Sequence, residues 1–280
     1  MRMDDIEFLH EKILYPVVRV RSRSAGGSGV LVYSKPDPKH TSEHINIVLT
    51  CEHVIDEAIQ LREEFDPVLK RERKIDYFEE VTVELFDYIG SKLISANATK
   101  SSIIAYDKRH DIAALKLNNP LPQNHVATLI GKDDIPNLRL FESVYTAGCS
   151  LSHDPFANPG TLTYLRQMID QKAYLMANAP AVFGNSGGGL FRGDDGALLG
   201  LTSRVTTIDL GFSIDILTWM AFSTHPQRLY EFFDYHELQF IYDDKDDYYS
   251  AQERREKRRK EAMRSILLGE GTKQRASEFG

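Results

Sequence analysis

The chain has 280 residues, of which 42% are hydrophobic and 27% are charged, and its formal net charge is −7 at pH 7. This is an ordinary balance for a globular protein that is long enough to bury a sizeable core. The negative charge argues against a protein that coats nucleic acid or an anionic membrane with its whole surface.

The cysteines and the N-terminus indicate the compartment. Cys51 and Cys149 are the only cysteines, too few for a disulfide framework, and we expect both to be buried, reduced thiols. The opening MRMDDIEFLHEKILYPVV has no apolar run of signal-peptide length. No segment approaches the roughly 18 apolar residues that span a bilayer. We therefore expect a cytoplasmic protein that makes no membrane contact.

Short apolar runs separated by turn residues fill the chain from about Ile13 to Ile214. Runs such as SGVLVYS, INIVLTC and IAALKL are rich in Val, Ile and Leu, and Gly, Asp, Asn or Pro lies between several of them. About a dozen such strands predict a sandwich or barrels rather than a parallel α/β sheet.

Three segments depart from this pattern. Residues 57–80 are charged and predict a helical insertion between strands. Residues 214–233 carry apolar residues at helical spacing and predict a C-terminal helix packed on the core. Residues 251–268 hold seven Lys or Arg and three Glu. We expect a solvated helix of mixed charge there. A nucleic-acid site is disfavoured because the segment lacks interleaved aromatic residues.

A glycine-rich turn, FGNSGGG at residues 183–189, surrounds Ser186. A serine nucleophile needs an exposed hydroxyl on a tight turn, with backbone N–H groups directed at the developing oxyanion. Glycines allow the dihedral angles and the close substrate approach that such a turn requires. A phosphate-binding turn and a plain hairpin fit the same pattern, so the turn alone leaves three interpretations open.

Two other segments supply the partners of a nucleophilic serine. In VLTCEHV an apolar strand runs into His53, where a general base belongs, although a structural histidine fits as well. In HDIAALKL Asp111 opens an apolar strand, where a carboxylate can fix a histidine tautomer, although a turn-capping aspartate fits too. His53, Asp111 and Ser186 follow one another at intervals of 58 and 75 residues, and together they favour catalysis.

These segments resemble the TxxHV, DxAxLK and GNSGG signatures of the chymotrypsin-like serine protease superfamily, and most closely those of its HtrA-like and glutamyl-endopeptidase-like branches. The resemblance runs from about Val17 to Phe233 and includes an opening hairpin, GGSGVLVYS, and a closing strand, LGFSID. About 47 residues follow Phe233. They are too few and too charged for the PDZ domain that HtrA proteins carry, so none is expected.

The resemblance implies an all-β fold of two six-stranded antiparallel β-barrels, with the helical insertion and the C-terminal helix added. It implies that His53 takes the proton of Ser186, that Asp111 orients His53, and that the N–H groups of Gly184 and Ser186 form the oxyanion hole. The expected divisions are a first barrel over residues 1–120, a second over 121–233 and a charged tail over 234–280.

The expected substrate is a protein or peptide, cleaved through an acyl-enzyme without a cofactor. The histidines show no metal-ligand spacing such as HExxH, so no metal site is expected either. Asn185 stands where trypsin-type zymogens have the aspartate that pairs with a new N-terminal amine. Activation by N-terminal trimming is therefore not expected.

By resemblance, residues 178–182, 202–204 and 210–213 line the pocket for the substrate residue before the cut. The candidate lining residues are Pro180, Thr202, Ser203, Arg204, Gly211 and Phe212. Because nothing acidic lies nearby until Asp209, we expect a neutral pocket that prefers small or medium apolar side chains. Arg204 either enters the pocket and favours an acidic residue or points to solvent.

Two alternatives bear on function. Cys51 lies two residues before His53, but the glycine-rich turn belongs to Ser186, which argues against a thiol nucleophile. The chain can also be a protease-fold binding or structural module, its cleft blocked by the 57–80 insertion that follows His53 closely. The insertion and the basic C-terminal tail are candidate contacts for a protein partner.

Overall fold

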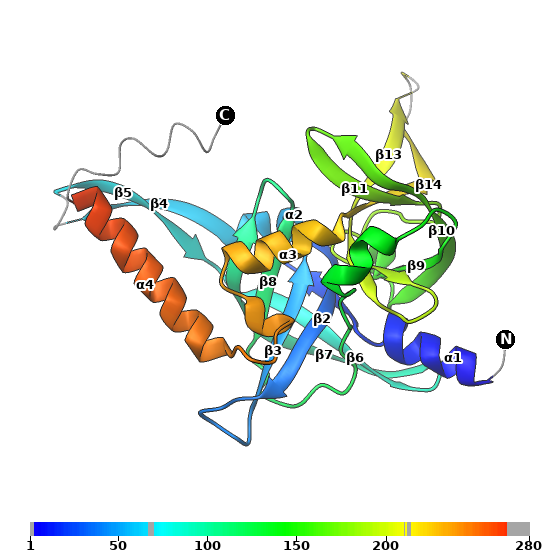
Figure 1. Cartoon of the computed structure of the whole chain (residues 1–280), viewed down its shortest axis with the longest axis horizontal. Coiled ribbons are helices and arrows are strands. Elements are labelled where there is room, and N and C mark those ends of the chain that lie inside the picture. Colours follow the sequence, from blue (N-terminus) through cyan, green and yellow to red (C-terminus); the bar gives the residue numbers. More distant parts are fainter. Residues whose placement is uncertain (1–2, 67–69, 210, 212–213, 268–280) are drawn as a thin grey trace. The chain divides into compact units, whose positions relative to one another are not determined.

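Two antiparallel β-barrels, each of six strands, make up most of this computed structural model (Figure 1), and they confirm the expected fold class. The structure describes residues 3–66, 70–209, 211 and 214–267. The chain divides into two compact units, Met1–Gln60 with Phe78–Glu231 and Leu61–Tyr77 with Phe232–Gly280. Both barrels belong to the first unit.

The first barrel closes in the strand order β1-β2-β3-β8-β7-β6. Its strands are β1 (Val17–Arg21), β2 (Gly26–Pro36), β3 (His44–Thr50), β6 (Val81–Ile89), β7 (Lys92–Asp107) and β8 (Ile112–Leu117). Branched apolar side chains such as Ile47, Val83 and Leu115 are completely buried in this barrel. Removal of these side chains from water provides the main driving force for closing the sheet.

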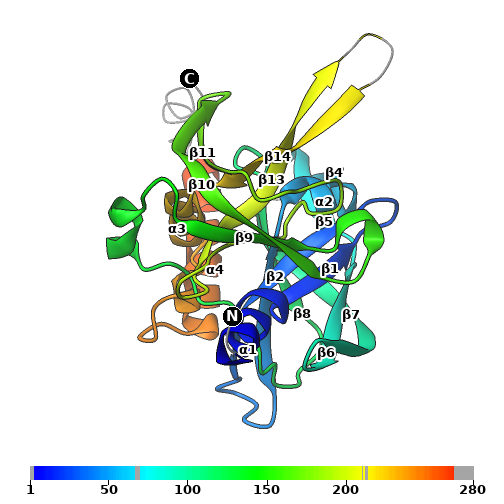
Figure 2. The same ribbon diagram turned by 90° about the vertical axis from the view of Figure 1, so that its right-hand side faces the viewer.

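The second barrel closes in the order β10-β11-β14-β13-β12-β9. Its strands are β9 (Ser143–Gly148), β10 (Phe156–Ile169), β11 (Lys172–Ala177), β12 (Gly189–Arg192), β13 (Leu198–Asp209) and β14 (Ile214–Thr224). The buried core cluster of this barrel includes Leu162, Leu175, Leu190 and Leu199. Figure 2 shows β13 and β14 projecting as a long hairpin beyond the rest of this barrel.

The predicted C-terminal helix over residues 214–233 is wrong in its first half. Residues 214–224 form β14, and helix α3 (Pro226–Tyr235) begins only at Pro226. Residues 221–226 are buried without interruption, and periodicity alone cannot distinguish such a run from a buried helix. Proline at the first helical position fixes the actual start, since its missing N–H costs nothing there.

The insertion is also not helical. It forms a two-stranded sheet of β4 (Ile59–Asp66) and β5 (Arg71–Phe78), joined to neither barrel sheet. The guanidinium of Arg62 lies 3.7 Å from the centre of the Tyr77 ring, a cation–π pair across the two strands. Leu61 and Phe65 are exposed. The glutamates and arginines of this segment favour a helix locally, but the cross-strand pairing prevails.

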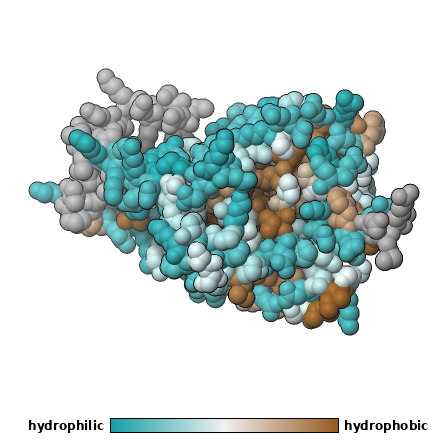
Figure 3. All heavy atoms as spheres, turned by 60° about the horizontal axis from the view of Figure 1, so that its bottom comes forward, coloured by the Kyte–Doolittle hydropathy of each residue, from teal (hydrophilic) through white to brown (hydrophobic). Residues whose placement is uncertain are grey.

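The remaining elements are short, except for one long helix. They are α1 (Met3–Leu9), the π-helix η1 (His10–Leu14), α2 (Glu52–Ile55), the 3₁₀ turns η2 (Asp56–Ala58), η3 (Lys132–Asn137), η4 (Ser150–Ser152) and η5 (Gln239–Ile241), and α4 (Tyr248–Leu267). In the part of the chain that the structure describes, none of the helices is long and apolar enough to cross a membrane. On the face that Figure 3 shows, apolar patches interrupt a mainly hydrophilic surface.

Candidate active site

The pairing of β3 with β8 brings His53 to Asp111. These strands run antiparallel with Thr50 opposite Ala113, so the residues just after β3 meet the residue just before β8. Asp111 has φ of 57°, a left-handed conformation that aspartate tolerates better than most residues. Its Oδ1 accepts the backbone N–H of His53 at 3.0 Å. Strand register and one backbone turn thus fix the two side chains together.

The imidazole of His53 is held by both oxygens of Asp111. Nδ1 of His53 lies 2.8 Å from Oδ1 and 2.9 Å from Oδ2 of Asp111. The hydroxyl of Ser203, on β13, donates to the same Oδ2 at 2.6 Å. With the proton on Nδ1 facing the carboxylate, Nε2 of the half-exposed ring is the nitrogen that can accept a proton. This is the arrangement that a general base requires.

The electrostatics of the pair match this geometry. The hydrogen bond to Asp111 raises the pKa of His53 above its ordinary value, although burial opposes the shift. Burial alone would raise the pKa of Asp111, but hydrogen bonds from His53 and Ser203 outweigh it and hold the pKa below its ordinary value. Asp111 is therefore a carboxylate at neutral pH, and it favours a positive charge on His53.

The turn around Ser186 is tied to β2 through Ser28. The backbone N–H of Ser28 donates to the carbonyl of Ser186 at 2.8 Å, and its hydroxyl donates to the carbonyl of Gly184 at 2.6 Å. Gly187 has φ of 83°, and a Cβ there would lie 2.2 Å from the carbonyl oxygen of Ser28. The turn can therefore pack against β2 only with glycine after Ser186.

The peptide before Gly184 is fixed in orientation. The carbonyl of Phe183 accepts the N–H of Leu151 at 2.8 Å. Because the N–H and C=O of a trans peptide point in opposite directions, the N–H of Gly184 is directed away from Leu151. Within the described residues, the N–H groups of Gly184 and Ser186 have no hydrogen-bond acceptor. Both donors that the sequence suggested for an oxyanion hole are therefore available.

The buried side-chain amide of Asn185 anchors the same turn. The side chain of Asn185 is 1% exposed and accepts the hydroxyl of Ser150. Cys149 N–H donates to the hydroxyl oxygen of Ser28 at 2.7 Å. Asn185 is thus engaged with η4. The large apolar side chains of Phe183 and Leu151 lie exposed beside the turn, 60% and 65% respectively.

The Ser186 turn also lies against the chain just before helix α2, which carries His53. A Cβ on Gly187 would lie 2.9 Å from the backbone nitrogen of Cys51, two residues before His53. Within the described part of the chain, however, the side-chain hydrogen bonds of the His53 ring are those to Asp111. The Ser186 turn therefore adjoins the segment before His53, and no hydrogen bond joins the Ser186 hydroxyl to the imidazole among the described residues.

The thiol of Cys51 is buried in this site. Its Sγ donates to the carbonyl of Thr202 at 3.3 Å. Burial and the nearby charge of Asp111 raise the pKa of the Cys51 thiol well above its ordinary value, so it stays protonated. Cys51, His53 and Asp111 have possible metal-ligand atoms within 4.8 Å of one another. Nδ1 of His53 and both oxygens of Asp111 are already engaged in hydrogen bonds with one another and with Ser203, so these ligand atoms serve the hydrogen-bonded pair.

The candidate pocket residues differ in their burial and in their contacts. Thr202 is buried, and its N–H donates to the carbonyl of Gly188 at 2.8 Å. Pro180 is exposed, and its carbonyl accepts the hydroxyl of Thr146 at 2.8 Å. Arg204 forms an ion pair with Asp170 at 3.0 Å. Its guanidinium also lies 5.5 Å from the centre of the Tyr174 ring. Arg204 is therefore held by its own barrel.

Gly211, which was expected to line the substrate pocket with residues 202–204, lies away from them along the β13–β14 hairpin. The register pairs Arg204 with Phe222 and Val205 with Ala221, and it continues to Asp209 opposite Ile214. Gly211 lies in the turn beyond that last pair, because β13 runs farther than the sequence suggested. Phe212 lies outside the described residues.

Sequence reasoning missed the residues that support the site. Ser203 was expected in a substrate pocket, but its hydroxyl is bound to Asp111. Ser28 and Ser150 were given no role, although both bind the turn around Ser186. The sequence GSG at residues 27–29 could have indicated the role of Ser28, since glycines around a serine at the start of a strand indicate close backbone packing.

Comparison with known proteins identifies the family. Residues 27–201, more than half of the chain, match the family described as the trypsin-like peptidase domain. None of the curated proteins matches the sequence. A solved structure of a variant of the HtrA-type protease AlgW with a tripeptide is similar at a TM-score of 0.57 and 15% identity, covering 85% of this chain and 64% of that one.

The structure of Deg5 is similar at a TM-score of 0.56 and 17% identity, over 82% of this chain and 94% of that one. Identities this low show a shared fold only, and this chain spans 64% of the AlgW chain. The family match and the two barrels agree with one another. The chain belongs to the trypsin-like peptidase domain family.

Proposed function

We propose that the chain is an active serine endopeptidase with Ser186 as nucleophile, His53 as general acid–base and Asp111 as the residue that orients His53. The observation that carries this proposal is the pair of short contacts from His53 Nδ1 to Asp111, which leaves Nε2 to act as a base beside the Ser186 turn. The family match supports the same chemistry.

The reaction proceeds in two halves. His53 Nε2 takes the proton of Ser186 as its Oγ attacks the scissile carbonyl, and Asp111 stabilises the resulting imidazolium without taking the proton. The N–H groups of Gly184 and Ser186 stabilise the oxyanion. His53 then protonates the leaving amine, and an acyl-enzyme remains on Ser186. Water, activated by the same histidine, releases the acyl group.

The missing hydrogen bond between Ser186 and His53 does not argue against this mechanism. In free enzymes catalytic hydrogen bonds are often long, and they shorten once substrate is bound. The same observation is also what favours the second candidate, a protease-fold binding module whose site is not competent. The two functions differ in whether Ser186 reacts.

The residue before the cut is proposed to be small or medium-sized and apolar. Ala181, which follows Pro180 in the chain, and Ala221, which pairs with Val205, are both buried and uncharged. The ion pair with Asp170 holds Arg204 away from the role of an anion receptor. A pocket without a free charge at these positions gives a charged side chain no partner, which favours an apolar one.

Cleavage of a peptide library tests the proposal. Folded wild-type protein is incubated with the library, and the products are sequenced by mass spectrometry beside those of Ser186→Ala. We expect cuts after residues such as Ala, Val or Thr, and at least a 10³-fold loss of rate, to order of magnitude, in the variant. Equal cleavage by both proteins would rule out Ser186 as the nucleophile. Cuts mainly after Lys or Arg would contradict the neutral pocket.

A further inference from the structure

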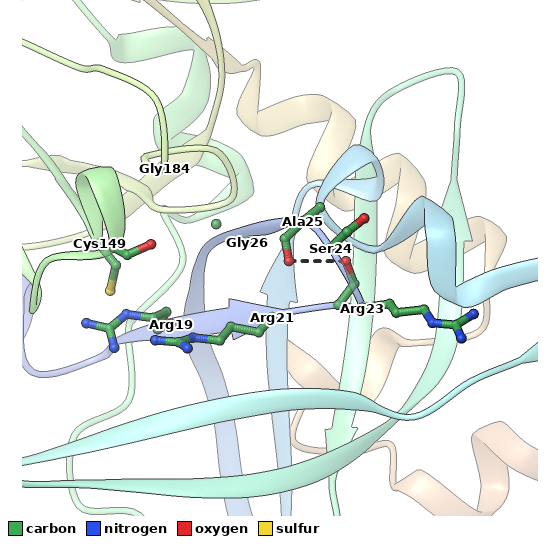
Figure 4. A pocket seen from close by; sticks show the side chains of 11 residues that line it. Arg19, Arg21, Arg23, Ser24, Ala25, Gly26, Cys149 and Gly184 are labelled. Carbon is green, nitrogen blue, oxygen red and sulfur yellow. Dashed lines mark hydrogen bonds between the residues drawn. The ribbon is translucent and has the colours of Figure 1, made fainter.

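A cavity of about 250 Å³ adjoins the nucleophile turn (Figure 4). Arginines 19, 21 and 23, from β1 and the turn that follows it, line one part of the cavity, and Gly184, Cys149 and Ser152 line another. Because Gly184 lies two residues before Ser186, a group bound in this cavity lies close to the reacting atoms.

Two contacts show on which side of Ser186 the cavity lies. On one side the N–H of Gly187 donates to the carbonyl of Thr202 at 2.8 Å, which ties the turn to β13 and to the candidate pocket for the residue before the cut. On the other side Ser28 binds the carbonyl of Ser186 and ties the turn to β2. Gly26 and Gly27, the first residues of β2, line the cavity. A substrate crossing Ser186 from β13 therefore places its leaving-group half here.

The arginines are only partly neutralised. Arg19 is buried, and Glu84 and Asp154 bind it. Arg21 contacts Glu84 through Nε at 3.1 Å, and its side chain remains 49% exposed. Its two terminal nitrogens donate no hydrogen bond to the described residues. Arg23 is exposed and has no acidic partner among them. Three guanidinium groups thus have two carboxylates as ion-pair partners, and a third carboxylate, that of Glu57, binds the lining residue Ser24. The cavity therefore offers an anion the free terminal nitrogens of Arg21 rather than a large net charge.

The directions of the side chains distinguish the three arginines. In Figure 4 the guanidinium groups of Arg19 and Arg21 extend to the same side, below Cys149, and that of Arg23 extends the opposite way. The shared contacts with Glu84 also place Arg19 and Arg21 together. Arg21 is therefore the exposed donor at the cavity, Arg19 supports it through Glu84, and Arg23 adds positive potential at longer range.

We propose that this cavity is a carboxylate subsite, in which Arg21 selects substrates that carry a carboxylate shortly after the scissile bond. This proposal rests on the proposed endopeptidase function. A guanidinium with two unused terminal nitrogens can bind a carboxylate through two parallel hydrogen bonds. The carboxylate is either the side chain of Asp or Glu or the C-terminus of a peptide, and the chemistry of recognition is the same.

Matched peptides test the subsite. All share one acyl half with alanine before the cut, so all form the same acyl-enzyme and differ only in acylation. Three leaving halves are compared. The first carries Glu and the second Gln, both with an amidated C-terminus, and the third carries Gln with a free C-terminal carboxylate. The rate constant kcat/KM is measured for the wild type, for Arg21→Gln and for the control Arg139→Gln. Arg139 is exposed and lies outside the cavity.

We expect wild-type protein to prefer one carboxylate peptide over the neutral one on the order of 10-fold, as for a hydrogen bond between charged groups. A preference for the Glu peptide identifies a side-chain carboxylate, and a preference for the free acid identifies a chain terminus. Arg21→Gln should reduce the preference to about twofold or less, since only weaker long-range attraction remains. Arg139→Gln should keep the preference.

Cleavage of all three peptides at equal rates would overturn the subsite and leave the endopeptidase function standing. A preference that survives in Arg21→Gln would overturn it as well. If folded wild-type protein cleaves no peptide and Ser186 does not react with a fluorophosphonate, the proposed function fails and the subsite fails with it.

Discussion

At the scale of single residues, the site depends on how Asp111 stays ionised. Three donors reach its two oxygens: the backbone N–H and Nδ1 of His53, and the hydroxyl of Ser203. They outweigh the burial that favours the neutral acid. The charge so maintained raises the pKa of His53, which makes the imidazole a stronger base.

The pH dependence of kcat/KM tests this pair. The base must be neutral to accept a proton, so activity should rise with pH through the pKa of His53. Because Asp111 raises that pKa, the acid limb should have its midpoint above about 6.5, the ordinary histidine value. Asp111→Asn should lower kcat by about 10⁴-fold and move the midpoint down. An acid limb that stays in place in Asp111→Asn would contradict the pairing.

His53, Asp111 and Ser186 could be chosen from sequence because each occupies a recognisable local setting: a strand end, a strand start and a glycine-rich turn. The role of Ser203 could not, because its contact with Asp111 depends on how β13 of one barrel meets β8 of the other. The position of Arg204 likewise depends on Asp170, which lies 34 residues earlier in the chain.

At the scale of elements, backbone packing rather than side-chain chemistry shapes the turn around Ser186. Gly187 faces the carbonyl of Ser28 and the hydroxyl of Thr50 at distances that leave no room for a Cβ. β2 and β3 of the first barrel thereby pack directly against the turn around Ser186, which leads into β12 of the second barrel. The geometry of Ser186 is a property of these strands together.

A pair of glycine variants separates crowding from backbone strain. Gly187 and Gly90 both have positive φ, but a Cβ on Gly90 would meet no described atom within 4 Å. Gly90→Ala should therefore cost about 1 kcal/mol of unfolding free energy, from strain alone. Gly187→Ala should cost at least about 2 kcal/mol more and abolish reaction of Ser186. Urea unfolding measures the free energy of unfolding of each variant, and active-site labelling measures the reaction of Ser186. Equal effects in the two variants would contradict the crowding at Gly187.

The junction of β14 and α3 should make the protein sensitive to acid. His225 is 9% exposed, and its Nδ1 accepts the N–H of Gln227 at the start of α3. Burial, with Arg166 and Arg228 nearby, lowers the pKa of His225 to about 4. The unfolded chain, with a histidine pKa of about 6.5, takes up the proton first, so stability is lost as pH falls from about 6.5 towards 4.

The loss attributable to His225 amounts to at most about 3 kcal/mol. His225→Asn keeps a side-chain acceptor for Gln227 and removes the titration. Unfolding free energies of both proteins at pH 7 and pH 4.5 measure the difference. A wild-type protein that loses no more stability than the variant would show that His225 is protonated in the folded state at an ordinary pKa.

The elements also show where sequence patterns fail. The short alternating strands of the barrels were predictable because burial on one face imposes a period of two. The 57–80 insertion and the segment 214–224 were not, since their helix-like composition and spacing gave way to pairing with a neighbouring strand. Local propensity does not reveal a partner that lies elsewhere in the chain.

At the scale of the whole molecule, two barrels contribute different parts of the candidate site. The first supplies His53 and Asp111, and the second supplies Ser186 and the hydroxyl of Ser203 that completes the shell of Asp111. The fold is shared with AlgW and Deg5 at only 15% and 17% identity. Barrel closure needs only alternating apolar strands, and few positions demand a particular residue.

The central claim is that Ser186 is an activated nucleophile, and covalent labelling tests it most directly. Folded wild-type protein is treated with a fluorophosphonate beside Ser186→Ala, and the modified residue is located by mass spectrometry. We expect one adduct, on Ser186, and none in the variant. Folded wild-type protein that remains unlabelled, or an adduct on another residue, would contradict the claim and favour the binding-module interpretation.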